Sequence, residues 1–222
     1  MVLDVFTDPD GFFEERADRT SAWMGLLVVI LATAVQAVTG ILQVQRLLSG
    51  TSEVGTVSVL FSAATVVVSF LAILVGWVLV ALVFYAATAF SDAERSFGET
   101  LAIAGWGYAP LILGGIVSAV LVYVALGNVT PPELHSVPQG NQSAMQDAMQ
   151  ANAEAIDEFF STLRDQTAYL VSAVLGIGFT LWQGWIWSAG LRRVVGLDRR
   201  RSFVVAGIPV AIAILWTIRG LA

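Results

Sequence analysis

Long uncharged stretches alternate with short charged ones along this chain. Arginine, aspartate, glutamate and the single histidine are absent from five stretches, which are residues 20–45, 54–91, 100–132, 166–191 and 202–218. A charge at the centre of a bilayer costs ~2.5–3.5 kcal/mol on insertion scales, so a membrane-embedded chain must sort its charges in this way. The pattern predicts an all-α, polytopic transmembrane helix bundle.

The length of each uncharged stretch sets the number of spans, because about 20 apolar residues cross the hydrocarbon core as a helix. Residues 57–90 would form a helix of ~51 Å against a core of ~30 Å. This segment is therefore either one long tilted helix or a tight hairpin broken near Gly76. With one helix here, the five predicted spans are about 22–43, 57–90, 100–126, 167–191 and 202–221.

The arginine positions distinguish these two topologies. With five spans, eight of the eleven arginines lie on the side of the N-terminus, and the other side holds Arg46, Arg164 and Arg219. A hairpin within 57–90 reduces the contrast to seven against four at best. Because cytoplasmic loops are rich in arginine, we predict five spans in the cell membrane, a cytoplasmic tail over residues 1–21 and an extracytoplasmic C-terminus.

The N-terminal tail is acidic, unlike the basic start of a signal peptide, so we expect the first span to remain as an anchor. Within the tail, Asp8-Pro9-Asp10-Gly11 predicts a turn. Phe12-Phe13 then opens a short helix that we expect at the membrane interface, with a disordered tail as the alternative.

Residues 127–166 form the one sizeable extracytoplasmic loop. Over residues 143–165 its apolar side chains recur at steps of three and four, with acidic residues between them, which predicts an amphipathic helix. Anionic lipid attracts basic helices, so we expect this acidic helix to pack on the bundle or on a partner protein. Asn128 and Asn141 lie in N-glycosylation sequons in the same loop, in agreement with an outside location.

Two prolines fall inside predicted spans. Pro110 in the third and Pro209 in the fifth each remove a backbone donor and leave the carbonyl four residues earlier without its helical partner. We therefore expect both helices to kink.

The composition narrows the chemistry. Cysteine is absent, which excludes disulfides, thiolate catalysis and cysteine-based metal sites. The lone His135 lies in the outer loop, and the carboxylates of Glu154, Asp157 and Glu158 are more typical of a solvated helix face than of a cation site. We predict no enzyme activity, no cofactor, no metal and no nucleic-acid partner, with the lipid bilayer as the first expected partner.

All eleven basic residues are arginine, and the formal net charge is −6. A lysine-free, acid-rich chain suits a salt-adapted, GC-rich source, which leads to the hypothesis of a halophilic archaeon. Codon bias alone is the alternative.

Five arginines gather in the loop before the last span: Arg192, Arg193, Arg199, Arg200 and Arg201. Their role in fixing topology needs no further explanation. The alternative is contact with anionic headgroups, at ~1 kcal/mol per arginine, or with an acidic cytoplasmic partner.

The strongest polar side chains within the spans include Gln36, Thr65, Ser69 and Gln183. Such groups usually form hydrogen bonds between helices. A hydrated path along them would favour a small passive transporter or channel. A sealed interior with a basic cytoplasmic face would favour a protein that interacts with lipids or other membrane proteins.

Three local features occur together in one known family. They are the tail with Asp8-Pro9 and Phe12-Phe13-Glu14, the segment from Ser96 to Leu101 that leads to Gly107-Tyr108-Ala109-Pro110, and a Trp- and Gly-rich fourth span that ends at Gly190-Leu191. With them, the chain resembles the Yip1 family of five-helix membrane proteins, in a prokaryotic or archaeal form. The resemblance implies one domain over residues 1–222.

Eukaryotic members of that family have cytoplasmic N-termini and are implicated in vesicle traffic through small GTPases and partner membrane proteins. This chain lacks their longer cytoplasmic region and its Tyr-Gly-Pro type motif, so GTPase binding is not transferred. Tyr108 and Pro110 match the motif of the family. We expect these two residues and Pro209 to have structural roles. The expected function is a non-enzymatic membrane protein that interacts with other membrane proteins or lipids, with its oligomeric state left open.

Overall fold

The computed structural model describes residues 3–16, 21–49, 54–89, 96–135, 140 and 142–221. Within these residues the chain forms helices and no strand. The helices are α1 (Asp4–Thr7), α2 (Pro9–Glu14), α3 (Ala22–Leu48), α4 (Val54–Thr88), α5 (Phe97–Trp106), α6 (Ala109–Gly127), α7 (Gln142–Arg164), α8 (Thr167–Arg193) and α9 (Arg199–Leu221).

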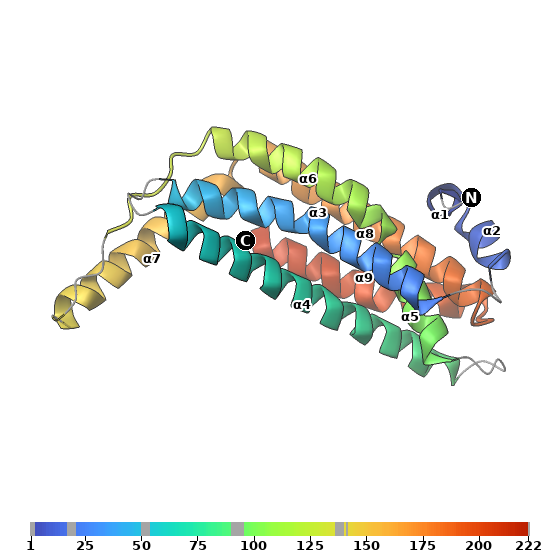
Figure 1. Cartoon of the computed structure of the whole chain (residues 1–222). Helices are drawn as coiled ribbons and strands as arrows, with labels where there is room; N and C mark the ends of the chain where they lie inside the picture. Colours follow the sequence, from blue (N-terminus) through green and yellow to red (C-terminus); the bar gives the residue numbers. More distant parts are fainter. Residues whose placement is uncertain are drawn as a thin grey trace.

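Five segments are long and apolar enough to cross a membrane, which confirms the predicted number of spans. They are α3, α4, the pair α5 and α6 taken together, α8 and α9. The N-terminus lies at one end of the bundle and α9 ends towards the other, as an odd number of spans requires (Figure 1). We call the end with α1 and α2 the tail end and the end with α7 the loop end.

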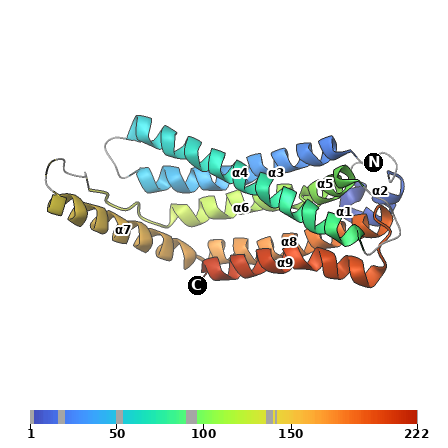
Figure 2. The same ribbon diagram turned by 90° about the horizontal axis from the view of Figure 1, so that it is seen from below.

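The second span is one continuous helix. α4 runs from Val54 to Thr88 and passes through Gly76 without a break, so the segment is the long helix and not the hairpin. It crosses the neighbouring helices obliquely, which accommodates its extra length (Figure 2).

The third span is two helices, and this corrects the expectation of one kinked helix over 100–126. α5 begins with a capping box, in which the backbone N–H of Ser96 donates to Glu99 Oε2 over 2.7 Å and the N–H of Glu99 donates to Ser96 Oγ over 3.3 Å. Pro110 lies in the first turn of α6, where a missing N–H has no cost. Pro209, in contrast, lies inside the continuous helix α9.

α7 confirms the predicted amphipathic helix, but only its last turns pack on the bundle. Phe159 and Leu163 are buried against residues of α6 such as Val122 and Leu126. The first half of α7 extends beyond the spans, as Figure 1 shows. The side chain of Asn152 holds the preceding loop there, because its amide bonds both the N–H and the carbonyl of His135, over 2.7 and 2.9 Å.

At the tail end the helices pack very closely. Gly25 of α3 and Gly105 of α5 face each other, and a Cβ at Gly105 would overlap the backbone of Gly25. Small residues allow helix backbones to approach in lipid, where van der Waals packing drives association. The α3–α5 contact therefore depends on glycine at this pair.

The substitution Gly105→Ala should lower the stability of the bundle. The added methyl group meets backbone atoms, which cannot move aside as a flexible side chain can, so we expect a cost of ~1–3 kcal/mol. Thermal unfolding in detergent measures the effect. Gly207→Ala is the matched control, because a Cβ at Gly207 meets nothing within 4 Å. Equal melting temperatures for the two variants would contradict the close contact.

Single-cysteine labelling tests the orientation, and the absence of native cysteine makes it simple. Ser49→Cys and Glu133→Cys, both exposed at the loop end, should react with an impermeable maleimide from outside intact cells. Ser96→Cys, exposed at the tail end, should react only after permeabilisation. The reverse pattern would place the N-terminus outside.

Candidate functional site

The N-terminal tail folds back into the tail end of the bundle. Asp8 caps α2 by accepting the N–H of Gly11 at Oδ1 over 3.0 Å, and Pro9 occupies the first turn. The helix thus begins at Pro9, before the predicted start at Phe12. The expected short helix is therefore present, but Phe12 and Phe13 are 1% and 0% exposed, so their rings pack inside the protein and not against lipid.

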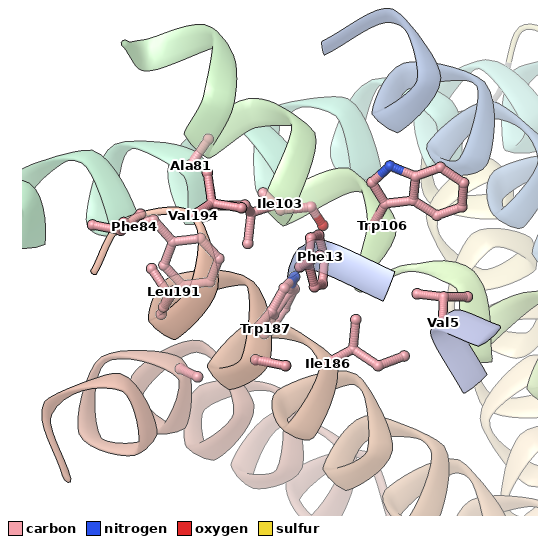
Figure 3. Close-up of a cluster of buried hydrophobic side chains, with 14 of the residues drawn as sticks. Val5, Phe13, Ala81, Phe84, Ile103, Trp106, Ile186, Trp187, Leu191 and Val194 are labelled. Carbon is pink, nitrogen blue, oxygen red and sulfur yellow. The ribbon is translucent and has the colours of Figure 1, made fainter. Parts of the chain in front are cut away.

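Aromatic side chains form the core that receives the tail. The ring of Phe12 meets that of Trp106 edge-on, with centroids 4.8 Å apart. Phe13 lies among Ile103, Trp187 and other apolar side chains (Figure 3). Gly190 leaves room for this arrangement, because a Cβ there would come within 3.2 Å of the Phe13 ring and closer to Ile103.

Trp187 stabilises the break between α5 and α6 by a hydrogen bond. In an unbroken helix the carbonyl of Ala104 would accept the N–H of Tyr108, but that N–H donates to Gly105 instead. The indole N–H of Trp187 donates to Ala104 O over 2.9 Å and so supplies the missing partner. A side chain at Gly107 would overlap this indole. The Gly107-Tyr108-Ala109-Pro110 segment and the Trp-rich fourth span therefore fit each other directly.

A charged cluster joins the tail to the end of α8. Asp10 Oδ2 binds Arg192 Nη2 over 2.6 Å, and Asp10 Oδ1 binds Arg193 Nε over 3.1 Å. Arg193 Nη1 also binds Glu14 Oε2 over 3.1 Å. Burial by itself raises the pKa of Asp10, but the hydrogen bonds and charges of Arg192 and Arg193 outweigh it, so its pKa lies below the ordinary value.

The five arginines of the predicted basic loop thus fall into two groups. Arg192 and Arg193 hold the tail. Arg199 and Arg200 are exposed on the first turn of α9 and form no ion pair within the described residues. Arg201 is also exposed and pairs with Asp198 over 3.2 Å. Arg199, Arg200 and Arg201 are the outward arginines of this surface.

A second candidate site is a groove within the membrane-spanning part of the bundle, with a volume of about 1300 Å³. α4 and α9 form its two sides, and α3, α6 and α8 form its back wall. Figure 2 shows that α4 and α9 approach each other at the tail end and diverge towards the loop end. Of the polar residues singled out in the spans, Gln36, Ser69 and Gln183 line the groove, whereas Thr65 is not among its lining residues.

Towards the tail end, the lining of the groove includes Tyr108 and Trp187. A Cβ at Gly76 would lie 3.8 Å from the Tyr108 hydroxyl, which places this hydroxyl against α4. Phe84 contacts Trp187 with ring centroids 5.5 Å apart, and the buried tail-end core continues beyond them. In the described part of the chain, the groove therefore does not reach the tail end.

Of the two sequon asparagines, the structure describes Asn128. Asn128 is exposed at the end of α6, where its amide donates to Val124 O over 3.3 Å. Asn141 lies outside the described residues. Among the residues that the structure describes, no three His, Asp or Glu side chains gather in a way that could hold a metal ion.

Sequence reasoning missed the pairing of Asp10 with Arg192 and Arg193. The acidic tail and the basic loop were predicted to lie on the same side of the membrane, and this shared location could have indicated that they pair. It also missed the role of Trp187 as a partner for Ala104. Nothing in the sequence shows which carbonyl loses its helical donor.

The Yip1 domain family matches residues 3–219. Neither a curated protein nor a solved structure matches the chain. The family match includes the tail, the broken third span and the Trp-rich fourth span, which the structure brings together at the tail end.

Asp10→Asn should weaken the docking of the tail. The variant leaves Arg192 and Arg193 without their shared carboxylate, and we expect a loss of ~1 kcal/mol because the cluster is only partly buried. A lowered pKa means that the carboxylate stabilises the fold above its unfolded pKa of about 3.9, and that this contribution is lost as the pH falls through the lower folded value.

The difference in melting temperature between wild type and Asp10→Asn should accordingly be largest at neutral pH and shrink below about pH 4. Glu15→Gln is the control, because Glu15 is exposed and pairs with its neighbour Arg16. A difference that is constant from pH 7 to pH 3 would mean that the carboxylate charge is not what holds the tail.

Proposed function

We propose that this chain, which belongs to the Yip1 family because the family's domain covers nearly all of it, is a non-enzymatic membrane protein that binds anionic partners at its tail end. The first such partner is an anionic lipid headgroup, and an acidic surface of another membrane protein is the second. The outward arginines carry the contact. In this proposal the tail end faces the cytoplasm, in the cell membrane of a salt-adapted archaeon.

The exposed position of Arg199 and Arg200 is the observation that carries the proposal. Both lie in the first turn of α9, where Asp198 caps the helix by accepting the N–H of Arg201 at Oδ1 over 2.9 Å. Placing cations there is unfavourable for the isolated helix, and an anion bound to them offsets this cost. The two exposed guanidinium groups are therefore what attracts the anion.

The tail restricts the binding surface to the outward arginines. Asp10 and Glu14 neutralise Arg192 and Arg193, which would otherwise compete for the same anions. Two parts of one loop thus have separate roles. Arg192 and Arg193 hold the tail on the bundle, and the outward arginines bind the anion.

Transport is not favoured by the groove. A passive transporter needs a path from one face of the membrane to the other. The groove meets the aromatic core at Trp187, and that core is held by the tail itself. Opening a path would require the tail to leave its binding site. We therefore do not extend the proposal to transport.

Lipid-dependent stabilisation tests the proposal. Phosphatidylglycerol added to the detergent-solubilised protein should raise its melting temperature more than phosphatidylcholine does, because a ligand that binds only the folded state stabilises it. At ~1 kcal/mol per arginine, the double variant R199Q/R200Q should bind phosphatidylglycerol about 30-fold more weakly.

The control is Arg219→Gln, which removes an exposed arginine at the opposite end of the same helix and should bind as wild type does. Equal affinity of wild type and R199Q/R200Q would refute the headgroup contact. A loss of affinity in Arg219→Gln as large as in the double variant would show that net charge, and not the site, decides binding.

A further inference from the structure

The groove between α4 and α9 has unused polar groups at its wall, and these carry an inference separate from the anionic site. We propose that the groove binds one uncharged amphiphile, a molecule with a long hydrocarbon chain and a neutral hydrogen-bonding group such as an ester or a hydroxyl. The molecule enters from the bilayer through the space between α4 and α9. Its neutral group meets Gln183 and Gln36.

Gln183 is the strongest evidence for a ligand. Gln183 as a whole is 4% exposed and lines the groove. Its side-chain amide is not fully buried, and it makes no hydrogen bond within the described residues. A polar group that faces an apolar groove without a partner is unfavourable, and such groups in native proteins are nearly always paired. A partner from outside the chain is therefore expected at this position.

Other polar groups line the same groove. Thr39 lines the groove, and its hydroxyl oxygen is buried without a hydrogen-bond partner among the described residues. The side-chain amide oxygen of Gln36, Oε1, lies beside Gly115, at 3.5 Å from the position that a Cβ would take there. These groups offer amide N–H donors, amide oxygens and a hydroxyl, which suits a ligand that both accepts and donates hydrogen bonds.

The charge pattern excludes an ionic headgroup in the groove. No arginine, aspartate, glutamate or histidine is among the lining residues. An anion or a cation at this depth would have no counter-ion, and its desolvation would not be repaid. The ligand's polar group must therefore be neutral.

The shape of the groove favours a long chain. Most of its lining is apolar, and its volume of about 1300 Å³ exceeds the ~300–1,000 Å³ of ordinary ligand pockets. Gly176 gives it depth on the α8 side, because a Cβ at this position meets nothing within 4 Å. A hydrocarbon chain fills such a space without unpaired polar groups.

Photolabelling with a neutral lipid tests the site. A monoacylglycerol with a diazirine in its acyl chain is added to the purified full chain in detergent, and the adducts are mapped by mass spectrometry. Adducts should gather on the segments of α4, α8 and α9 that line the groove. Unlabelled monoacylglycerol should reduce them at least tenfold.

Two glycine variants provide matched controls on one helix. Gly176→Phe fills the groove and should lower labelling at least tenfold. Gly178→Phe adds the same side chain at an exposed position that does not line the groove, and should label as wild type does. Melting temperatures of both variants establish that each is folded. Labelling that is not saturable, or that is equal in the two variants, would mean that the groove holds only bulk lipid and would overturn the proposal.

The polar group is tested with Gln183→Leu. This variant should bind monoacylglycerol at least fivefold more weakly than wild type, as measured by competition with the photoprobe. Its affinity for a plain alkane of the same length should be unchanged. Competition by a fatty acid anion as strong as by monoacylglycerol would refute the neutral character of the ligand. Loss of phosphatidylglycerol binding in R199Q/R200Q would leave this result unchanged, so the two proposals can fail independently.

Discussion

Charge is excluded from the hydrocarbon core, where one arginine or aspartate costs ~2.5–3.5 kcal/mol, and this exclusion orders the whole structure. Every charged residue that the structure describes lies near an end of the bundle or in the outer loop with α7. There, opposite charges from distant parts of the sequence lie close enough to pair, as Asp10 and Arg192 do. The spans themselves are left to pack by shape, through glycines and aromatic rings.

The bundle is consequently asymmetric along its axis. At the tail end, the tail, α5 and the end of α8 bury a dense aromatic core that includes Phe13, Trp106 and Trp187. Towards the loop end, α4 and α9 diverge and leave the groove. The same helices are therefore tightly joined on one side of the membrane and accessible to lipid on the other.

This asymmetry connects the two proposed sites. The outward arginines lie at the tail end, between the buried residues Leu197 and Ala206 of the core along the chain. The groove lies on the open end, where a lipid-sized molecule can enter without disturbing that core. Tyr108 and Pro110, which the family resemblance marked as structural, lie at the boundary, because the chain breaks there between α5 and α6.

Hydropathy, charge sorting and helical periodicity can be read along the chain, so they predicted five spans and the amphipathic helix. They favoured one helix over 57–90 against a hairpin, and the structure established it. The sequence also marked Gln36, Ser69 and Gln183 as polar residues in the spans. Four features follow from the packing of the helices alone. Phe12 and Phe13 are buried, the third span is broken, Arg192 and Arg193 hold the tail, and those polar residues share one groove. Each of these depends on contacts between residues far apart in the chain, such as Trp187 with Ala104 and Gly25 with Gly105, which no local pattern encodes.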